Sequence, residues 1–270
     1  MSDAVVELLE QEWAAIADLI DTVTDEEWEL PTALPGWSVR DNVTHIIGTE
    51  SMLLGEPSPN VAVDHLPHVR DPFAAAGETW IEARRQRSRD EVRSELLDVT
   101  GRRLAALRAM SDDELAAVGW SPIGEVPYRA FMMVRVFDCW MHEQDIRRAI
   151  GRPGHLHGPV VDAALQRFEG AMGFVVGKKA GAPDGSSVVF EVHGATERIY
   201  PIVVEGRASL RAPEDAPADP TVTISLPFET FVALGGGRWD REQALAAGDV
   251  TIRGDEDLAR SVLDNFAFTP

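Results

Sequence analysis

Residues 131–145 read FMMVRVFDCWMHEQD, and this stretch decides how the first half of the chain is interpreted. From Ala130 to Met141 a helix of this sequence is apolar on nearly every side, except at Arg135 and Asp138. A helix that is apolar all round is buried among other elements. The stretch therefore predicts a helix over about 127–150 that packs inside a helical domain.

Four polar side chains share an arc of roughly 80° on this helix, at about 100° per residue. They are Arg135, Asp138, His142 and Asp145. A buried charge is costly unless it is paired or bound to a metal. Asp138 and His142 are four residues apart, so they point to one place and can offer an oxygen and a nitrogen to a divalent cation. The spacing equally allows an ion pair between Arg135 and Asp138, with His142 as a hydrogen-bonded core histidine.

Further helical patterns surround this stretch, and together they favour a helix bundle. Ser38 followed three residues later by Asp41 resembles a capping box at the start of the second helix. Ser111 is placed to begin one short extra turn. No strand pattern occurs before about residue 180. The helical patterns cover residues 5–23, 38–54, 72–87, 90–110 and 127–150.

The sequence GRPG at residues 151–154 marks the expected domain boundary, because Gly and Pro in succession end helices. We therefore predict a helical domain over residues 1–153 and an α+β domain over residues 154–270. After a helical pattern at 160–176, strand-like alternation predicts a mostly antiparallel sheet. The predicted strands are 188–193, 199–204, 221–226 and 250–253, with helices at 228–234, 241–247 and 255–266.

Length and composition narrow the class of protein. A chain of 270 residues corresponds to roughly two domains. The formal net charge of −20 argues against a nucleic-acid partner. The absence of a long apolar segment and of a secretion signal predicts a cytoplasmic protein that does not insert into a membrane. The single cysteine, Cys139, excludes an internal disulfide and a cysteine-rich metal site.

Two separated motifs give the chain a family resemblance. PGWSVRDNVTH at residues 35–45 and DCWMHEQDIR at residues 138–147 closely resemble the mycothiol-dependent maleylpyruvate isomerase family, within the wider DinB-like metalloenzymes. The segment from DVTIRGD at 249–255 to the final FAFTP resembles the end of the sterol-carrier-like C-terminal domain found in many members. The resemblance implies a DinB-like four-helix bundle followed by a sterol-carrier-like α+β domain.

The resemblance also implies a metal site. Members hold one divalent metal, usually zinc, through a histidine on the second helix and a carboxylate and histidine on the last; these correspond here to His45, Asp138 and His142. The isomerase itself has glutamate where this chain has Asp138. His45 lies about 120° from the apolar stripe of its helix, so only the resemblance places it at the site. Such a set leaves ligand positions open, and the implied cosubstrate is the low-molecular-weight thiol mycothiol.

A thiol bound to the metal loses its proton near neutral pH and reacts as a thiolate. Two reactions of such a thiolate are possible. The preferred interpretation is an S-transferase that joins the thiol to a small electrophile, because nothing in the sequence specifies maleylpyruvate. The alternative is cis–trans isomerisation of maleylpyruvate. A rival from another class is a non-catalytic protein that binds a metal or an apolar ligand, and a metal-free bundle is a third possibility. The electrophile, the metal among Zn, Ni, Fe and Mn, and the oligomeric state are left open by the sequence.

Two other residues bear on this chemistry. Arg238, in the sequence GGGRW, is the candidate cation for an anionic substrate, because isomerase relatives are thought to bring an arginine from the C-terminal domain to the site. A surface arginine in a glycine turn is the alternative. Cys139 lies in the apolar run, where burial raises the pKa of a thiol, so we expect it to serve packing and not catalysis.

Overall fold

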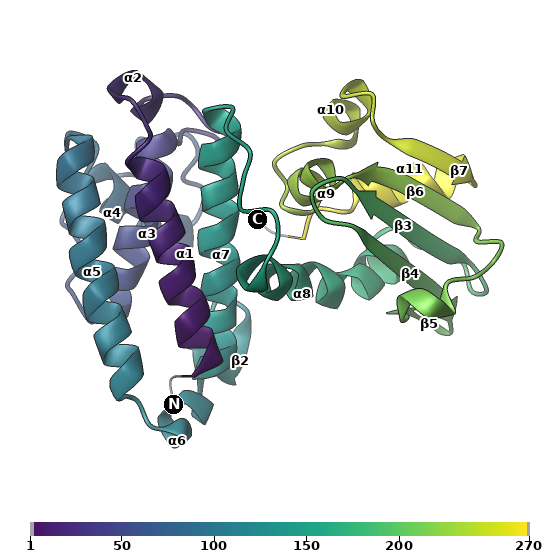
Figure 1. The fold of residues 1–270 in the computed structure, drawn as a ribbon, viewed down its shortest axis with the longest axis horizontal. Helices are drawn as coiled ribbons and strands as arrows, with labels where there is room; N and C mark the ends of the chain where they lie inside the picture. Colours follow the sequence, from purple (N-terminus) through teal and green to yellow (C-terminus); the bar gives the residue numbers. More distant parts are fainter. Residues whose placement is uncertain (1–2, 269–270) are drawn as a thin grey trace. The chain divides into compact units, whose positions relative to one another are not determined.

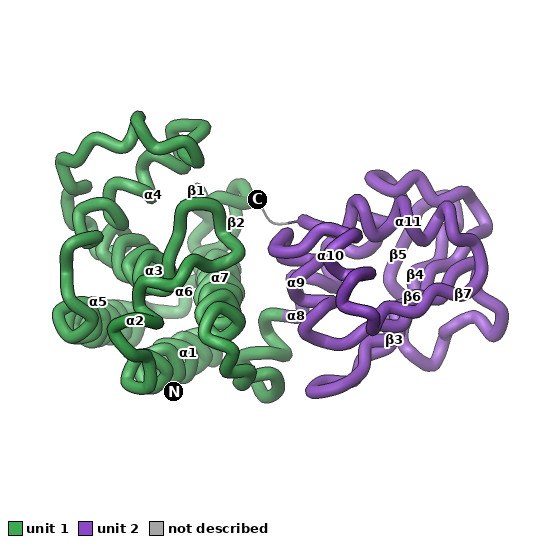
Figure 2. The backbone as a smooth tube through the Cα atoms, turned by 90° about the horizontal axis from the view of Figure 1, so that it is seen from above, with its two compact units in different colours: residues 1–164 green, residues 165–270 purple. Residues whose placement is uncertain are grey.

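The computed structural model describes residues 3–268, and these form two compact units (Figures 1 and 2). The first unit ends at Ala164 and the second begins at Leu165, so the division falls within helix α8 (Pro159–Phe174). The boundary at residues 153 and 154 stays a prediction. In the described part of the chain, no helix is long and apolar enough to cross a membrane.

The first unit is built around four long helices, as the sequence predicts. Helices α1 and α7 pack together, α7 packs on α3, α3 on α5, and α5 on α1, which closes a four-helix bundle (Figure 1). Apolar side chains such as Leu9, Ile46 and Trp140 are fully buried between them. The helices are α1 (Ala4–Ile20), α2 (Asp25–Trp28), α3 (Val39–Leu53), α4 (Pro72–Glu82), α5 (Arg89–Ala109), α6 (Asp112–Ala116) and α7 (Tyr128–Ala149).

The start of α3 is fixed by the predicted capping box. The Ser38 hydroxyl accepts from the backbone N–H of Asp41, and the Asp41 carboxylate accepts from the backbone N–H of Ser38 at 2.8 Å. Such reciprocal bonds satisfy the backbone donors at a helix N-terminus. Ser111 caps α6 in the same way, in agreement with the predicted extra turn. The box sets where α3 begins, and with it which residues of α3 face α7.

A short hairpin corrects the expectation that no strand precedes residue 180. Strands β1 (Val118–Ser121) and β2 (Gly124–Pro127) pair antiparallel, with Ser121 opposite Gly124. Gly124 has a φ of 105°, and the Ser121 hydroxyl donates to its carbonyl at 2.7 Å. The strands are too short, and too exposed, to produce an alternating pattern. The turn between the strands, which includes Gly124, is the feature of the sequence that indicates the hairpin.

The second unit contains the predicted mostly antiparallel sheet. Its strand order is β5-β4-β3-β6-β7, and the β3–β6 pair alone is parallel in this described sheet. The strands are β3 (Ser187–His193), β4 (Arg198–Glu205), β5 (Arg207–Leu210), β6 (Val222–Pro227) and β7 (Thr251–Gly254). Strand β5 was not predicted, because its four residues, RASL, include no β-branched or aromatic residue and follow the turn residue Gly206 directly.

Helices cover this sheet and complete a separate aromatic core. They are α9 (Phe228–Gly235), α10 (Arg241–Ala246) and α11 (Glu256–Asp264), with a π-helical turn at Val175–Lys179. Phe231 lies at the centre of the core, with ring contacts to Phe168, Phe190, Tyr200 and Phe266. Both predicted domain classes, a helical bundle and an α+β domain, are therefore confirmed.

The close packing of α3 on α4 depends on a glycine. A Cβ added at Gly48 would lie 2.4 Å from the Cβ atom of Trp80, which is buried on α4. We expect Gly48→Ala to lower the free energy of unfolding by about 1–3 kcal/mol, because the helices must move apart. Gly101→Ala on α5 is the matched control, since its added Cβ meets no described atom within 4 Å beyond its own helix. That change should stabilise by about 0.5–1 kcal/mol. Urea unfolding of both variants measures the difference, and equal effects would contradict the prediction.

Candidate metal centre

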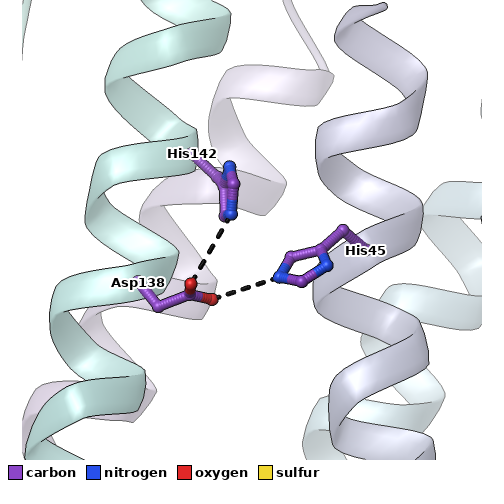
Figure 3. A group of neighbouring side chains, drawn as sticks. All are labelled: His45, Asp138 and His142. Carbon is purple, nitrogen blue, oxygen red and sulfur yellow. Dashed lines mark hydrogen bonds and ion pairs between the residues drawn. The ribbon is translucent and has the colours of Figure 1, made fainter. Parts of the chain in front are cut away.

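Helices α3 and α7 bring His45, Asp138 and His142 together (Figure 3). The Nε2 atom of His45 lies 3.3 Å from Asp138 Oδ2, and the Nε2 atom of His142 lies 3.6 Å from Asp138 Oδ1. One nitrogen from each histidine and one carboxylate oxygen lie within 4.8 Å of one another. The carboxylate therefore contacts both imidazoles, whose ring centroids lie 4.7 Å apart.

His45 faces this site although it lies away from the apolar stripe of α3. The reason is that α3 packs against α4, α5 and α7, so more than one side of it is buried. The apolar stripe meets some of these neighbours, and a polar stripe with Asn42 and His45 meets α7. Hydrophobic periodicity detects only the first of these faces. On a helix that is buried on several sides, apolar periodicity does not mark the polar face that carries the functional residues.

The donor set fits a divalent cation. Two imidazole nitrogens and one carboxylate oxygen are ligands that zinc and similar metals accept, with further positions left for small molecules. Exposure differs among the three side chains: 31% for Asp138, 19% for His45 and 7% for His142. The centre is thus accessible on the Asp138 side.

Asn42 determines which nitrogen of His142 can bind a metal. Its amide nitrogen donates to the carbonyl of Ser38 at 2.9 Å and to Thr32 Oγ1 at 3.3 Å. Its Oδ1 therefore faces His142 Nδ1, 2.9 Å away, and can only accept. Nδ1 must then carry a proton, so Nε2, which faces Asp138, is the nitrogen that a metal can bind. Bonds of this kind fix both the tautomer and the ring orientation of a metal ligand.

Asp145 supports the same histidine from the next turn of α7. Its Oδ2 lies 3.5 Å from His142 Nδ1, and its Oδ1 lies 3.4 Å from Arg148. The Asp145 carboxylate thus contacts both His142 and Arg148.

We expect Asn42→Ala to weaken metal binding about 10–100-fold, the usual effect of removing the partner of a liganding histidine. A competition titration with a chromogenic chelator measures the affinity. Thr44→Ala is the control on the same helix, because Thr44 is buried but its hydroxyl donates to the Asp41 carbonyl. Equal affinities for the two variants would contradict an orienting role of Asn42.

Trp37 forms an aromatic wall beside the two histidines, which sequence reasoning missed. Its ring centroid lies 5.0 Å from that of His45 and 5.5 Å from that of His142. The indole N–H donates to Glu78 Oε2 at 3.1 Å, which holds the ring in place. Trp37 belongs to the PGWS sequence of the first family motif, but its spacing from other residues did not connect it with the metal site.

A buried charge network lies next to the centre. Arg135 donates to the Asp138 carboxylate and, at 2.9 Å, to Glu50 Oε1. The second Glu50 oxygen accepts from Arg103 at 2.9 Å. The predicted ion pair between Arg135 and Asp138 therefore exists alongside the histidine contacts. Glu50, which is fully buried on α3, was missed because a single glutamate carries no sequence signal.

The protonation of the three residues follows from these neighbours. Burial alone would raise the pKa of Asp138, but Arg135 and the two histidines hold it well below its usual value. Burial lowers the pKa of His45, and the bond to Asp138 only partly opposes this. Burial also acts to lower the pKa of His142, but Asp138 and Asp145 outweigh it and raise that pKa. The centre therefore offers an ionised carboxylate to a cation.

Cys139 and Arg238 lie in different surroundings. Cys139 is fully buried on α7, and burial raises the pKa of its thiol well above the usual value. Arg238 belongs to the second unit, where it follows α9; it is 9% exposed and donates to the Gly236 carbonyl. It is thus mostly buried, and its action on a substrate stays a prediction.

The fold and the site together define a class: a helical bundle with a histidine–carboxylate cluster, followed by a sterol-carrier-like domain. The model of the mycothiol maleylpyruvate isomerase N-terminal domain matches residues 9–147, and that of the SCP-2 sterol transfer family matches residues 165–264. The chain belongs to the mycothiol-dependent maleylpyruvate isomerase family. All three clustered residues lie within the first match, and Arg238 lies within the second.

Solved structures extend the likeness to nearly the whole chain. The crystal structure of the mycothiol-dependent maleylpyruvate isomerase matches with a TM-score of 0.58 and 17% identity, over 92% of this chain and 91% of that one. A histidine-to-alanine variant of the mycothiol-dependent maleylpyruvate isomerase matches over the same shares, with a TM-score of 0.57 and 17% identity. At this identity the likeness shows a shared fold. Among curated proteins none matches significantly.

Proposed function

We propose that this protein is a mycothiol-dependent metalloenzyme, an S-transferase that joins mycothiol through its sulfur to a small electrophile. His45, Asp138 and His142 would hold one divalent metal, with zinc the first candidate. The observation that carries the proposal is the convergence of two imidazole nitrogens and one carboxylate oxygen within 4.8 Å. Membership of the family supports mycothiol as the thiol.

The chemistry requires a thiolate near neutral pH. A divalent metal supplies it, because a coordinated thiol loses its proton far more readily than a free one. The chain's own groups orient the centre: Asn42 and Asp145 hold His142, and the Trp37 ring packs beside both histidines. Cys139 is buried and protonated, so the reacting sulfur comes from the cosubstrate.

The electrophile class follows from the charges beside the centre. Arg135 is already bound to Glu50 and Asp138, so it is not free to receive substrate carboxylates. A neutral electrophile suits this environment better than a dianion. In the transfer step the sulfur forms a bond to the electrophilic carbon, and the electron pair of the broken bond departs with the leaving group.

Isomerisation is the second candidate, because the family match and the full-length structural matches are to a maleylpyruvate isomerase. The thiolate would add to the activated double bond, rotation would follow about the resulting single bond, and elimination would restore the thiolate. The two substrate carboxylates need cations, and Arg238 is the proposed source of one.

The test uses the metal-loaded protein with mycothiol and either a neutral alkyl halide or maleylpyruvate. S-transfer predicts a thioether adduct with consumption of the thiol, whereas isomerisation predicts a product of unchanged mass and no net loss of thiol. Mass spectrometry and a thiol assay distinguish them. A metal-loaded protein that produces neither, and binds no mycothiol in a calorimetric titration, would favour the non-catalytic binding protein.

A further inference from the structure

A second cluster of ligand atoms lies in the first unit, formed by Glu12 on α1, Glu143 on α7 and His155 in the loop after α7. Both glutamates are fully buried, and the His155 side chain is 21% exposed. The Nδ1 atom of His155 lies 2.6 Å from Glu143 Oε2 and 3.5 Å from Glu12 Oε2. One atom from each residue lies within 4.8 Å of the others.

Glu12 has no hydrogen-bond donor to satisfy it. Neither of its carboxylate oxygens accepts a hydrogen bond from the residues that the structure describes, although both are buried. Glu143, in contrast, accepts from Arg147 at 2.7 Å as well as contacting His155. A buried carboxylate without a partner is strongly unfavourable, so it must bind a cation or take up a proton. Burial raises the pKa of Glu12 well above its usual value, and the charge of Glu143 and a hydrogen bond between the two carboxyl groups act in the same direction.

We propose that Glu12, Glu143 and His155 form a second divalent-cation site, separate from the centre at His45, Asp138 and His142. Two carboxylates and one imidazole are a ligand set that zinc accepts. A cation about 2.0–2.2 Å from each ligand atom would bridge the observed separations of 2.6 and 3.5 Å after small side-chain shifts. One shared proton would join only two of the three groups, whereas a cation would contact all three.

The two sites lie on different faces of α7. His142 and Glu143 are successive residues, so their side chains leave the helix about 100° apart. His142 meets residues of α3, whereas Glu143 meets the loop residue His155 near Glu12 of α1. A cation at the second site would not share a ligand with the first.

The surroundings of the second site indicate a structural role. The loop is tied to α7 because Trp140 donates to the His155 carbonyl at 3.0 Å and Gln144 donates to the Gly154 carbonyl at 3.2 Å. A cation would add a link from this loop to α1, which otherwise meets the cluster only through the unsatisfied Glu12. It would fasten the first helix of the bundle to the end of the last.

The test is the zinc content of full-length protein that has been stripped, reloaded with Zn²⁺ and dialysed. We expect about two ions per chain in the wild type, about one in His142→Ala, about one in Glu12→Gln and almost none in the double variant. Glu10→Gln is the matched control, because Glu10 is an exposed glutamate of α1 paired with Arg108, and it should retain both ions.

A second measurement guards against misfolding. Zinc should raise the melting temperature of His142→Ala by several degrees, and should not do so when Glu12→Gln or His155→Ala is added. The proposal is wrong if reloaded His142→Ala holds no zinc, or if it holds the same amount with either added change. The cluster would then be a proton-sharing carboxyl pair. An unchanged zinc content in Glu12→Gln would overturn the second site and leave the centre at His142 untouched, whereas an unchanged content in His142→Ala would overturn that centre, so the two proposals fail separately.

Discussion

Replacing His142 with alanine is expected to remove one metal ion per chain and to lower the thiol-dependent activity at least about 100-fold. The reason is that His142 offers its Nε2 lone pair to the centre while Asn42 fixes the proton on the other nitrogen. Loss of a metal ligand should exceed the 10–100-fold effect of losing a group that only orients one. Elemental analysis and the adduct assay on the same preparations measure both quantities.

His65→Ala is the matched control for this prediction. His65 is an exposed loop histidine of the first unit, so its loss should change neither metal content nor activity. Equal metal in His142→Ala and the control would rule out the centre, and full activity in His142→Ala would rule out its part in the reaction. Reduced activity with unchanged metal would assign His142 to substrate and not to the metal.

Removing the carboxylate of Glu50 should have the largest effect on stability. Glu50 is fully buried and joins Arg103 of α5 to Arg135 of α7, so Glu50→Ala leaves two buried guanidinium groups without this partner. Breaking a buried ion pair from one side costs about 3–5 kcal/mol. Chemical unfolding monitored by circular dichroism gives the free-energy difference.

Glu56→Ala is the comparison for Glu50→Ala, because Glu56 forms an exposed pair with Arg102. A pair in solvent contributes about 0–1 kcal/mol, so this variant should unfold nearly as the wild type does. Losses of similar size in the two variants would show that the Glu50 network does not hold the bundle together. Glu50→Gln should lie between, since the amide keeps one acceptor oxygen but turns an NH2 donor toward the other arginine.

Much of the fold could be predicted because long helices and regular strands repeat their pattern many times. The stretch at 131–145 identified a buried helix, and the Ser38–Asp41 box identified the first turn of α3. The β1–β2 hairpin and strand β5 escaped because these four-residue strands contain at most one β-branched residue each, whereas the equally short β7 lies in the run VTIR at 250–253. Their turns are set by Gly124 and Gly206, both with positive φ, and not by apolar alternation.

The candidate site was predictable to a different extent. Asp138 and His142 share a helix face, so their proximity follows from spacing. His45 comes from another helix, and only the family resemblance joined it to the pair. Asn42, Trp37 and Glu50 were not predicted as parts of the site, because their roles depend on which sides of α3 and of the PGWS turn meet α7. Long-range packing of this kind leaves no periodic trace in the sequence.

The amide of Asn42 has one further consequence, for how such a protein can evolve. It contacts Thr32 and the Ser38 carbonyl on one side and the proposed ligand His142 on the other. A mutation that reshapes the turn before α3 would also rotate this amide and disturb His142, which lies 100 positions from Asn42 in the sequence. Natural variation in the turn is thereby coupled to the last helix of the bundle, and lineages that change one segment should carry compensating changes in the other.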